Sequence, residues 1–138
     1  MLWYCYYHFV WATKNRQPLI LPHLENLIFD TIRQKTIELS SHNQIYAINA
    51  MPDHIHVAIS LYPNISISDW IKRVKGASSH AVNATYPDEE HRFRWQRGYS
   101  VHTYGAKVLP FVIGYIKNQK QHHADGNLEV YLEEIALD

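Results

Sequence analysis

The chain has 138 residues, the size of one domain, and we expect residues 1–138 to form a single domain. Its 13 basic and 13 acidic residues cancel, which argues against coating duplex DNA by bulk charge but allows a local basic groove. Cys5 is the only cysteine, so an internal disulfide and a cysteine-rich zinc site are excluded. The sequence shows no signal-peptide pattern, no long apolar run and no glycine-rich nucleotide loop, so we expect a cytoplasmic protein without a nucleotide cofactor.

The first half of the chain predicts a strand, a helix and a hairpin. Residues 3–13 alternate aromatic and β-branched side chains, which is typical of a strand. Pro22 can open a helix, and apolar positions at the helical period continue to about residue 40. Residues 44–50 and 54–61 predict two strands of a hairpin that turns at residues 51–53.

The second half adds a helix, a strand and a C-terminal helix. Ser66 and Asp69 have the spacing of a helix N-terminus, and an apolar face follows as far as Ala81. Residues 93–103 alternate as a fourth strand, with Gly98 as a bulge, and a long helix runs from Pro110 to Gly126. Residues 127–137 predict a short helix packed on the outside. The order indicates an α+β, ferredoxin-like βαββαβ fold whose four-stranded antiparallel sheet has two helices on one face. The last helix or a partner subunit must cover the other face.

His54 and His56 are the first candidate for chemistry. Residues two apart on a strand point to the same face, so both imidazoles can bind one divalent metal. Taken alone, the pattern favours two surface histidines, because His-x-His is a weak motif.

The predicted C-terminal helix provides a second group of side chains. Tyr115 and Gln119 are four residues apart and share a face, which His122 continues one turn later beside His123. A tyrosine can act as a nucleophile, although its pKa of about 10 means that it needs a metal or a base. Without further context, an aromatic core position is the simpler interpretation.

Basic residues form two clusters, and those of the second cluster alternate with aromatic residues. Such a pattern suits phosphate contacts and base stacking on single strands, and a solvated charged face explains it equally well. The members are Lys72, Arg73 and Lys75 in the second helix and Arg92, Arg94 and Arg97, which alternate with Phe93 and Trp95.

Together these motifs resemble the single-tyrosine HUH transposases of the insertion-sequence two-hundred type, in which HUH stands for histidine, hydrophobic residue, histidine. The order and spacing of the motifs are specific, and they reverse the simpler interpretations of the histidine pair, Tyr115 and Gln119. The matching stretches are residues 7–16 (YHFVWATKNR), 50–56 (AMPDHIH), 71–72 with 75–76 (IK and KG), 95–99 (WQRGY) and 115–119 (YIKNQ).

The resemblance implies a DNA transposase that cleaves and rejoins single-stranded DNA, often at hairpin ends of a mobile element. It implies that His54, His56 and Gln119 bind Mg²⁺ or Mn²⁺, and that Tyr115 forms a 5′-phosphotyrosine intermediate without a nucleotide cofactor. It further implies a homodimer in which the helix with Tyr115 serves the histidine pair of the other subunit. Because these three ligands are neutral, we expect weak metal binding without DNA. DNA contacts are expected at Lys72, Arg73, Lys75, Arg94 and Arg97.

Three alternatives stay open at this point. The first is a catalytically idle nucleic-acid-binding module on a ferredoxin-like sheet. The second is a domesticated relative, a repetitive-palindrome-associated tyrosine transposase. The third is a metal-dependent hydrolase that uses His54, His56, His122 and His123 and forms no covalent protein–DNA adduct.

Overall fold

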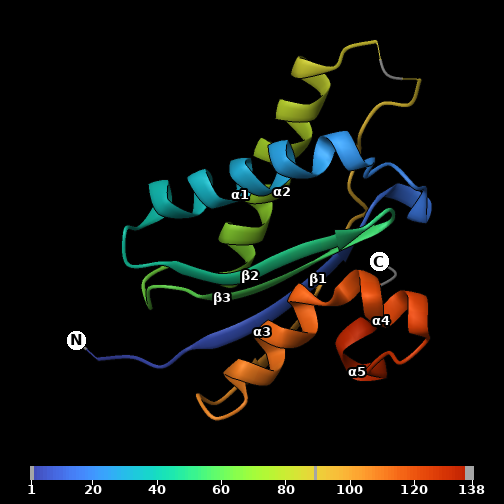
Figure 1. The fold of residues 1–138 in the computed structure, drawn as a ribbon. Coiled ribbons are helices and arrows are strands. Elements are labelled where there is room, and N and C mark those ends of the chain that lie inside the picture. Colours follow the sequence, from blue (N-terminus) through green and yellow to red (C-terminus); the bar gives the residue numbers. More distant parts are fainter. Residues whose placement is uncertain (1, 89, 136–138) are drawn as a thin grey trace.

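The computed structural model describes residues 2–88 and 90–135, which build one antiparallel sheet between two layers of helices (Figure 1). The four strands lie in the order β2-β3-β1-β4, and this confirms the predicted α+β, ferredoxin-like arrangement. Their bounds are β1 (Tyr6–Ala12), β2 (Gln44–Met51), β3 (His54–Ser60) and β4 (Ser100–Tyr104).

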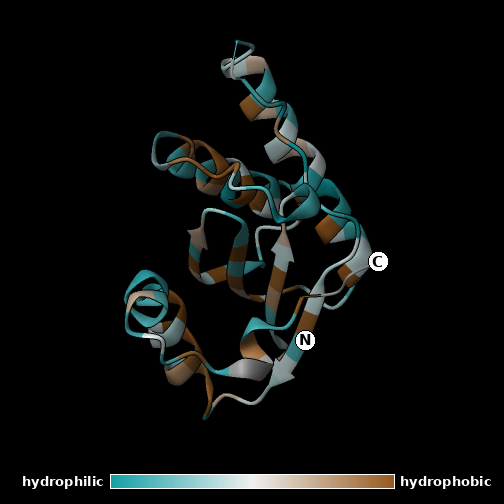
Figure 2. Cartoon of the chain, turned by 90° about the vertical axis from the view of Figure 1, so that its right-hand side faces the viewer, coloured by the Kyte–Doolittle hydropathy of each residue, from teal (hydrophilic) through white to brown (hydrophobic). Residues whose placement is uncertain are grey.

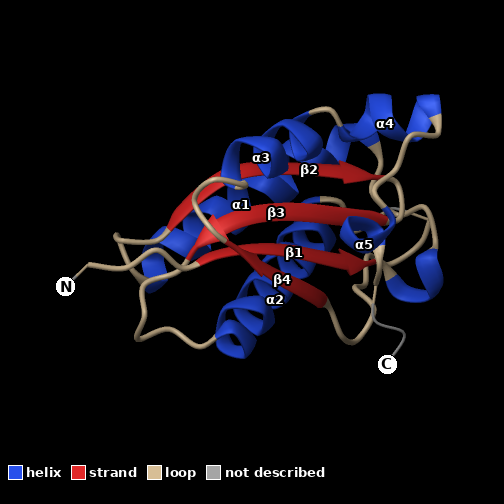
Figure 3. Cartoon of the chain, turned by 90° about the horizontal axis from the view of Figure 1, so that it is seen from below, coloured by secondary structure: helices blue, strands red, loops and turns tan. Residues whose placement is uncertain are grey.

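The two faces of the sheet carry different helices. Figure 3 shows the sheet from below, with α3 and α5 in front of the strands and α1 and α2 behind them. Short 3₁₀ helices (η) precede the first long helix. The bounds are η1 (Lys14–Arg16), η2 (Pro22–Leu24), α1 (Glu25–Leu39), α2 (Ile67–Thr85), α3 (Leu109–Lys117), α4 (Gln119–Asp125) and α5 (Val130–Glu133). None of the helices in residues 2–88 and 90–135 combines the length and apolarity that crossing a membrane requires.

Strand alternation assigns side chains to the two layers. Phe9 and Trp11 of β1 are buried in the main core, toward α1 and α2. His8 has the opposite parity and lies on the face that α3, α4 and α5 cover, as do His54 and His56 of the central strand β3. Figure 2 shows hydrophobic stretches along the strands between the two helical layers. The buried face therefore presents a row of imidazoles inside the protein.

The first strand and the second helix lie where they were predicted, with a small change at the start of the strand. β1 begins at Tyr6 and not at Trp3, because the pairing of β1 with both neighbours ends at Tyr6. Trp3 packs instead against the rings of His42 and Tyr62. Ser66 is the N-cap of α2 as predicted, with its hydroxyl accepting a hydrogen bond of 3.0 Å from the backbone N–H of Asp69.

The fourth strand is shorter than predicted. Residues 93–103 were expected to form it, but β4 begins only at Ser100, and Trp95 makes a single bridge with Thr13. Side chains of α2 take over the backbone groups of this segment: the Asn83 amide bonds both the N–H and the C=O of Phe93. The Lys75 ammonium donates to the carbonyls of Gln96 and Gly98 at 2.9 and 2.6 Å. The alternation of apolar residues here thus accompanies packing on α2 and only a short pairing with the end of β1, where the N–H of Gln96 donates to the carbonyl of Ala12 at 2.8 Å.

The predicted long C-terminal helix is two helices, α3 and α4, joined at Asn118. The Asn118 side-chain amide donates to the carbonyl of Gly114 and so competes with the helical hydrogen bonds of the backbone. From β2, the Asn49 amide donates to the carbonyls of Ile116 and Lys117 at 3.0 and 3.3 Å. The end of α4 at Gly126, with a left-handed φ of 72°, is as predicted.

The C-terminal segment also differs from the prediction. Residues 127–137 were expected to pack outside as a short helix, yet only α5 (Val130–Glu133) is helical, and residues 136 and 137 lie outside the described residues. Glu133, the last residue of α5, points inward, and 13% of the Glu133 side chain is exposed. The segment thus reaches the histidine pair.

Candidate active site around the histidine pair

His54 and His56 stand next to each other on the inner face of β3, and both are buried. Each imidazole is held through its Nδ1 atom. His54 Nδ1 lies 2.7 Å from the Asp53 carboxylate, and His56 Nδ1 lies 2.9 Å from Nε2 of His8, a buried histidine of β1. The Nε2 atoms of the pair both face the Glu133 carboxylate. This is the arrangement of metal-binding histidines, whose other nitrogen is fixed by a second group.

Helix α3 brings Tyr115 to the pair. Its residues Val112 and Ile116 pack on Ala47 and Ala58 of the sheet and form a second, smaller core. This packing places the ring of Tyr115 with its centroid 6.3 Å from that of His56. The resemblance implies that this helix serves a partner subunit, whereas in the single chain it lies on its own sheet.

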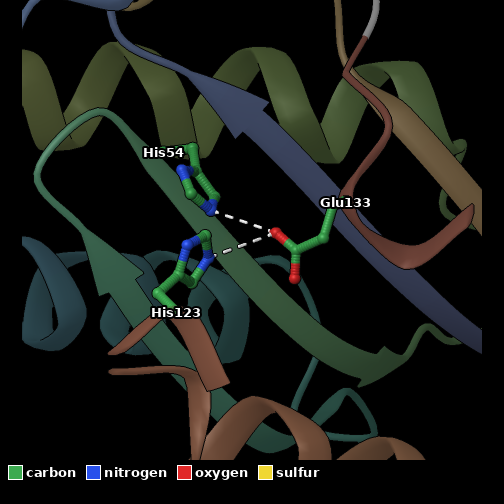
Figure 4. Close-up of side chains that lie close together, drawn as sticks. All are labelled: His54, His123 and Glu133. Atoms are coloured by element: carbon green, nitrogen blue, oxygen red, sulfur yellow. Dashed lines mark ion pairs between the residues drawn. The ribbon is translucent and has the colours of Figure 1, made fainter. Parts of the chain in front are cut away.

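The Glu133 carboxylate is where these side chains meet. Its Oε2 accepts hydrogen bonds from the Tyr115 hydroxyl and, at 2.8 Å, from the Gln119 amide. Its Oε1 lies 3.2–3.4 Å from the Nε2 atoms of His54, His56 and His123. Figure 4 shows His54, His123 and Glu133 converging from β3, α4 and α5. Tyr115 and Gln119 thus lie on one face, as their spacing predicts, although the helix breaks between them.

The ionisation of these groups follows from burial and contact. Burial lowers the pKa of His56 and of His123, which favours neutral imidazole, the form that binds metals. Burial raises the pKa of the Glu133 carboxyl, but contacts with His54, His56 and Tyr115 outweigh it and hold this pKa well below its usual range. Burial, and then the hydrogen bond to Glu133, raises the pKa of Tyr115. Tyr115 is therefore a poor nucleophile without a group that takes up its proton or charge.

Three buried polar atoms of this cluster have no hydrogen-bond partner within the described residues. They are His54 Nε2, His123 Nε2 and Gln119 Oε1. Buried polar atoms are rarely left unsatisfied, so each such atom points to a missing partner. Two of them, His54 Nε2 and Gln119 Oε1, belong to the ligand set that the resemblance implies. One nitrogen or oxygen of His54, His123 and Glu133 each lies within 4.8 Å of the others, which is close enough to share one ion.

The cluster is reached from the surface. An open cavity of about 350 Å³ has His54 and His123 in its wall. Arg16 lies at the same cavity and pairs with Asp53 at 3.0 Å. The cavity thus presents a guanidinium, paired with a carboxylate, beside the imidazoles.

A larger groove, of about 700 Å³, lies between α2 and residues 92–99. Four of the five predicted DNA contacts line it, namely Lys72, Lys75, Arg94 and Arg97. Arg73, the fifth, is absent from its lining and pairs with Asp69 at 3.0 Å. Arg92 lines the groove as well, together with the ring of Trp95.

The structure thus brings together Tyr115, Gln119 and the histidine pair, and it keeps His122 on the face of Tyr115. The His122 ring stacks on that of Tyr115 at 4.6 Å, and its Nδ1 bonds the Asn127 amide. The contact of His8 with the pair was missed, although its parity on β1 could have indicated it. Glu133 was missed as well, and no motif or periodicity marks it.

Comparisons with known proteins identify the family of the chain. The family model "Transposase IS200 like" matches residues 1–119. The ISDra2 transposase TnpA of Deinococcus radiodurans is 26% identical over 117 residues, covering 82% of each protein. The transposase for insertion sequence element IS200 of Salmonella typhimurium is 29% identical over 128 residues, covering 90% of this chain and 82% of its own length.

Solved structures have the same fold. A crystal structure described as a putative transposase from Deinococcus radiodurans superposes with a TM-score of 0.68 at 25% identity, over 86% of this chain and 93% of its own. A REP-associated tyrosine transposase bound to a REP hairpin has a TM-score of 0.67 at 18% identity, over 89% of this chain and 72% of its own. Since the family model spans the sheet, both helices of the main layer and α3 up to Gln119, this chain belongs to the IS200-like transposase family.

Proposed function

We propose that this transposase acts on single-stranded DNA, which it cleaves and rejoins through a 5′-phosphotyrosine at Tyr115. The observation that carries the proposal is the meeting of the Tyr115 hydroxyl, the Gln119 amide and both imidazoles of the pair at one partly buried carboxylate. A nucleophile and neutral metal-binding side chains stand on one face of the sheet. These are the parts that phosphoryl transfer to a side chain requires.

The proposed reaction conserves the phosphodiester. The Tyr115 oxygen gives up its proton to solvent and bonds to the DNA phosphorus while the bond from phosphorus to the 3′ oxygen breaks. That oxygen takes a proton and leaves as a 3′-OH. In the second step a 3′-OH attacks the same phosphorus, releases Tyr115 and rejoins the strand. No nucleotide cofactor is needed, because the linkage keeps its energy in the intermediate.

His54, His56 and Gln119 fit the metal-ligand roles that we propose for them, with Mg²⁺ or Mn²⁺ as the ion. The Nε2 atom of His54 and the Oε1 atom of Gln119 are buried without partners among the described residues, and His56 Nδ1 is fixed by His8. When bound, the ion supplies charge withdrawal from the scissile phosphate. The chain's own part is to hold Tyr115 in place, to keep the imidazoles neutral and to exclude water.

DNA recognition is proposed for the groove beside α2. Its exposed Lys72, Arg94 and Arg97 suit phosphate contacts, and the partly buried rings of Trp95 and Tyr99 suit contact with unpaired bases. The hairpin-bound relative supports a hairpin as the ligand, since it has the same fold. The chain's zero net charge makes such a local basic surface necessary.

A homodimer is part of the proposal. Val108 and Phe111 near the start of α3 are 42% and 50% exposed and offer an apolar surface to a second copy. Mixing a His54→Ala, His56→Ala protein with a Tyr115→Phe protein tests exchange of α3 between subunits. Regained cleavage in the mixture means that α3 serves the partner, and no recovery despite demonstrated subunit exchange means that each chain uses its own Tyr115.

The direct test of the function is a search for the adduct. Labelled single-stranded DNA with candidate hairpins is incubated with Mn²⁺ or Mg²⁺ and run on a denaturing gel. The proposal predicts a metal-dependent shifted band that Tyr115→Phe abolishes and that Tyr104→Phe, a matched tyrosine on β4, retains. Specific binding without cleavage supports the idle binding module instead. Cleavage without an adduct supports the hydrolase, for which the facing pair of His54 and His123 is the relevant observation.

A further inference from the structure

We propose that Glu133 and His123, both beyond the part of the chain that the family model matches, are metal ligands beside the histidine pair. The inference rests on the proposed metal dependence and adds a carboxylate and a third imidazole to it. It makes the metal site a mixed imidazole and carboxylate set that binds its ion in the absence of DNA.

The distances around Glu133 fit shared coordination better than hydrogen bonding. The separations of Oε1 from the Nε2 atoms of His54 and His123 are 3.3 and 3.4 Å. Neither nitrogen has a hydrogen-bond partner in the described part of the chain, although both are buried. Ligand atoms that share an ion at bond lengths of about 2.0–2.2 Å lie about 2.9–3.4 Å apart, depending on the geometry. The observed separations of Oε1 from the two nitrogens match such a distance between two ligand atoms.

Among the described residues, no lysine or arginine pairs with the Glu133 carboxylate. Among the described residues the ionic partners of Glu133 are the imidazoles of His54, His56 and His123, and its side chain is only 13% exposed. A buried carboxylate is costly unless a positive charge or strong hydrogen bonds compensate it. The Tyr115 hydroxyl and the Gln119 amide bond Oε2, and His56 Nε2 is within hydrogen-bond distance of Oε1, at 3.2 Å. The Nε2 atoms of His54 and His123 also face Oε1 but make no hydrogen bond to it. A divalent ion would satisfy Oε1 and both nitrogens at once.

The chemistry of the set identifies the class of ion. A mixed set suits first-row ions, from Mn²⁺, which favours the carboxylate oxygen, to Zn²⁺, which favours imidazole, better than Mg²⁺, which prefers oxygen ligands and retains its water. The neutral set of two histidines and a glutamine led us to expect weak binding without DNA. A carboxylate supplies one negative charge to the site, so this expectation changes to measurable Mn²⁺ binding by the free protein.

The test is a Mn²⁺ titration of the DNA-free protein, in which the electron paramagnetic resonance signal counts the unbound ion. We expect Glu133→Gln to weaken Mn²⁺ binding at least about tenfold. Removing a residue that only hydrogen-bonds a metal ligand already lowers metal affinity by about that factor, and Glu133 is proposed as a ligand itself. His123→Asn should weaken it as well. Glu129→Gln is the matched control, because this nearby carboxylate is not part of the ligand group, and it should bind like the unchanged protein.

Two further measurements keep the outcomes separate. Thermal unfolding of each variant without metal shows whether it is folded, and Glu133→Asp, which keeps the charge, replaces Glu133→Gln if that variant unfolds. Glu133→Gln binding Mn²⁺ as tightly as the unchanged protein, or more tightly, overturns the inference. In that case the double variant His54→Ala, His56→Ala is tested in the same way. If it no longer binds Mn²⁺, the proposed function stands. If it still binds Mn²⁺, the metal site of the proposed function is contradicted as well.

Discussion

His8 should control the metal affinity of the site without touching the metal. It is fully buried on β1, and burial, followed by the neighbouring His56, lowers its pKa to about 3, so it is neutral at pH 7. Its Nε2 lies 2.9 Å from Nδ1 of His56. When Nε2 of His56 binds a metal, its proton must sit on Nδ1, and His8 is the group that accepts this hydrogen bond.

The cost of removing that acceptor can be worked out in two ways. His8→Phe fills the space with a ring of similar size but leaves a buried N–H of His56 without a partner, which costs about 1–3 kcal/mol. Outer partners of metal-binding histidines are worth about 10–100-fold in affinity, or about 1.4–2.8 kcal/mol. Both routes predict that His8→Phe weakens Mn²⁺ binding by one to two orders of magnitude, and that His8→Gln, whose amide can accept the bond, restores part of it.

The assay is the same Mn²⁺ titration, with a control for general destabilisation. Thr36→Val removes another buried side-chain hydrogen bond, the one of 3.0 Å from the Trp70 indole, on the opposite layer of the protein. It should lower the free energy of unfolding by a similar amount and leave Mn²⁺ affinity unchanged. Unchanged affinity in His8→Phe, or an equal loss in Thr36→Val, would refute the positioning role of His8.

Three further predictions concern DNA binding and folding. Arg97→Ala should weaken hairpin DNA binding and lower the slope of its salt dependence by about 0.7 for each phosphate that the protein no longer neutralises, measured by fluorescence anisotropy at several salt concentrations. Arg73→Ala should change neither, because Arg73 lies outside the groove lining and pairs with Asp69; an equal effect of both would contradict the groove. Ser66→Ala should lower the free energy of unfolding by about 1 kcal/mol in urea denaturation, since it removes the N-cap of α2. Gly126→Ala should cost about 1–2 kcal/mol, because its φ of 72° strains any side chain although no atom lies within 4 Å of the added Cβ; an unchanged free energy of unfolding would exclude backbone strain at this helix end.

The fold was predictable from sequence because each main element has a local signal. Alternation on residues 7–11 separates the main core from the imidazole face, and the hairpin turn places His54 at the start of β3. The helical spacing of Tyr115 and Gln119 was enough to bring both to one carboxylate. Identical parity on neighbouring strands, in contrast, would have revealed His8 only once the pairing of β1 with β3 was known.

The features that sequence missed depend on contacts between distant residues. Phe93 and Trp95 alternate like a strand, yet Asn83 and Lys75 of α2 bind the backbone around them, and pairing is limited to the bridge of Trp95 with Thr13. The break between α3 and α4 depends on Asn49 from β2 as well as on local sequence. Glu133 sits in a helix of four residues, which has no periodicity to detect. Its approach to the histidines is a tertiary contact.

The most direct test of the account is to locate the covalent link on the protein. After reaction with a labelled hairpin DNA and Mn²⁺, trypsin cleaves behind Lys107 and Lys117 and releases residues 108–117, in which Tyr115 is the only tyrosine. We expect mass spectrometry to find this peptide carrying a 5′-phosphorylated nucleotide, and Tyr115→Phe to yield no modified peptide at all. Modification of another peptide, such as residues 98–107 with Tyr99 and Tyr104, or cleaved DNA with every tyrosine peptide unmodified, would contradict it.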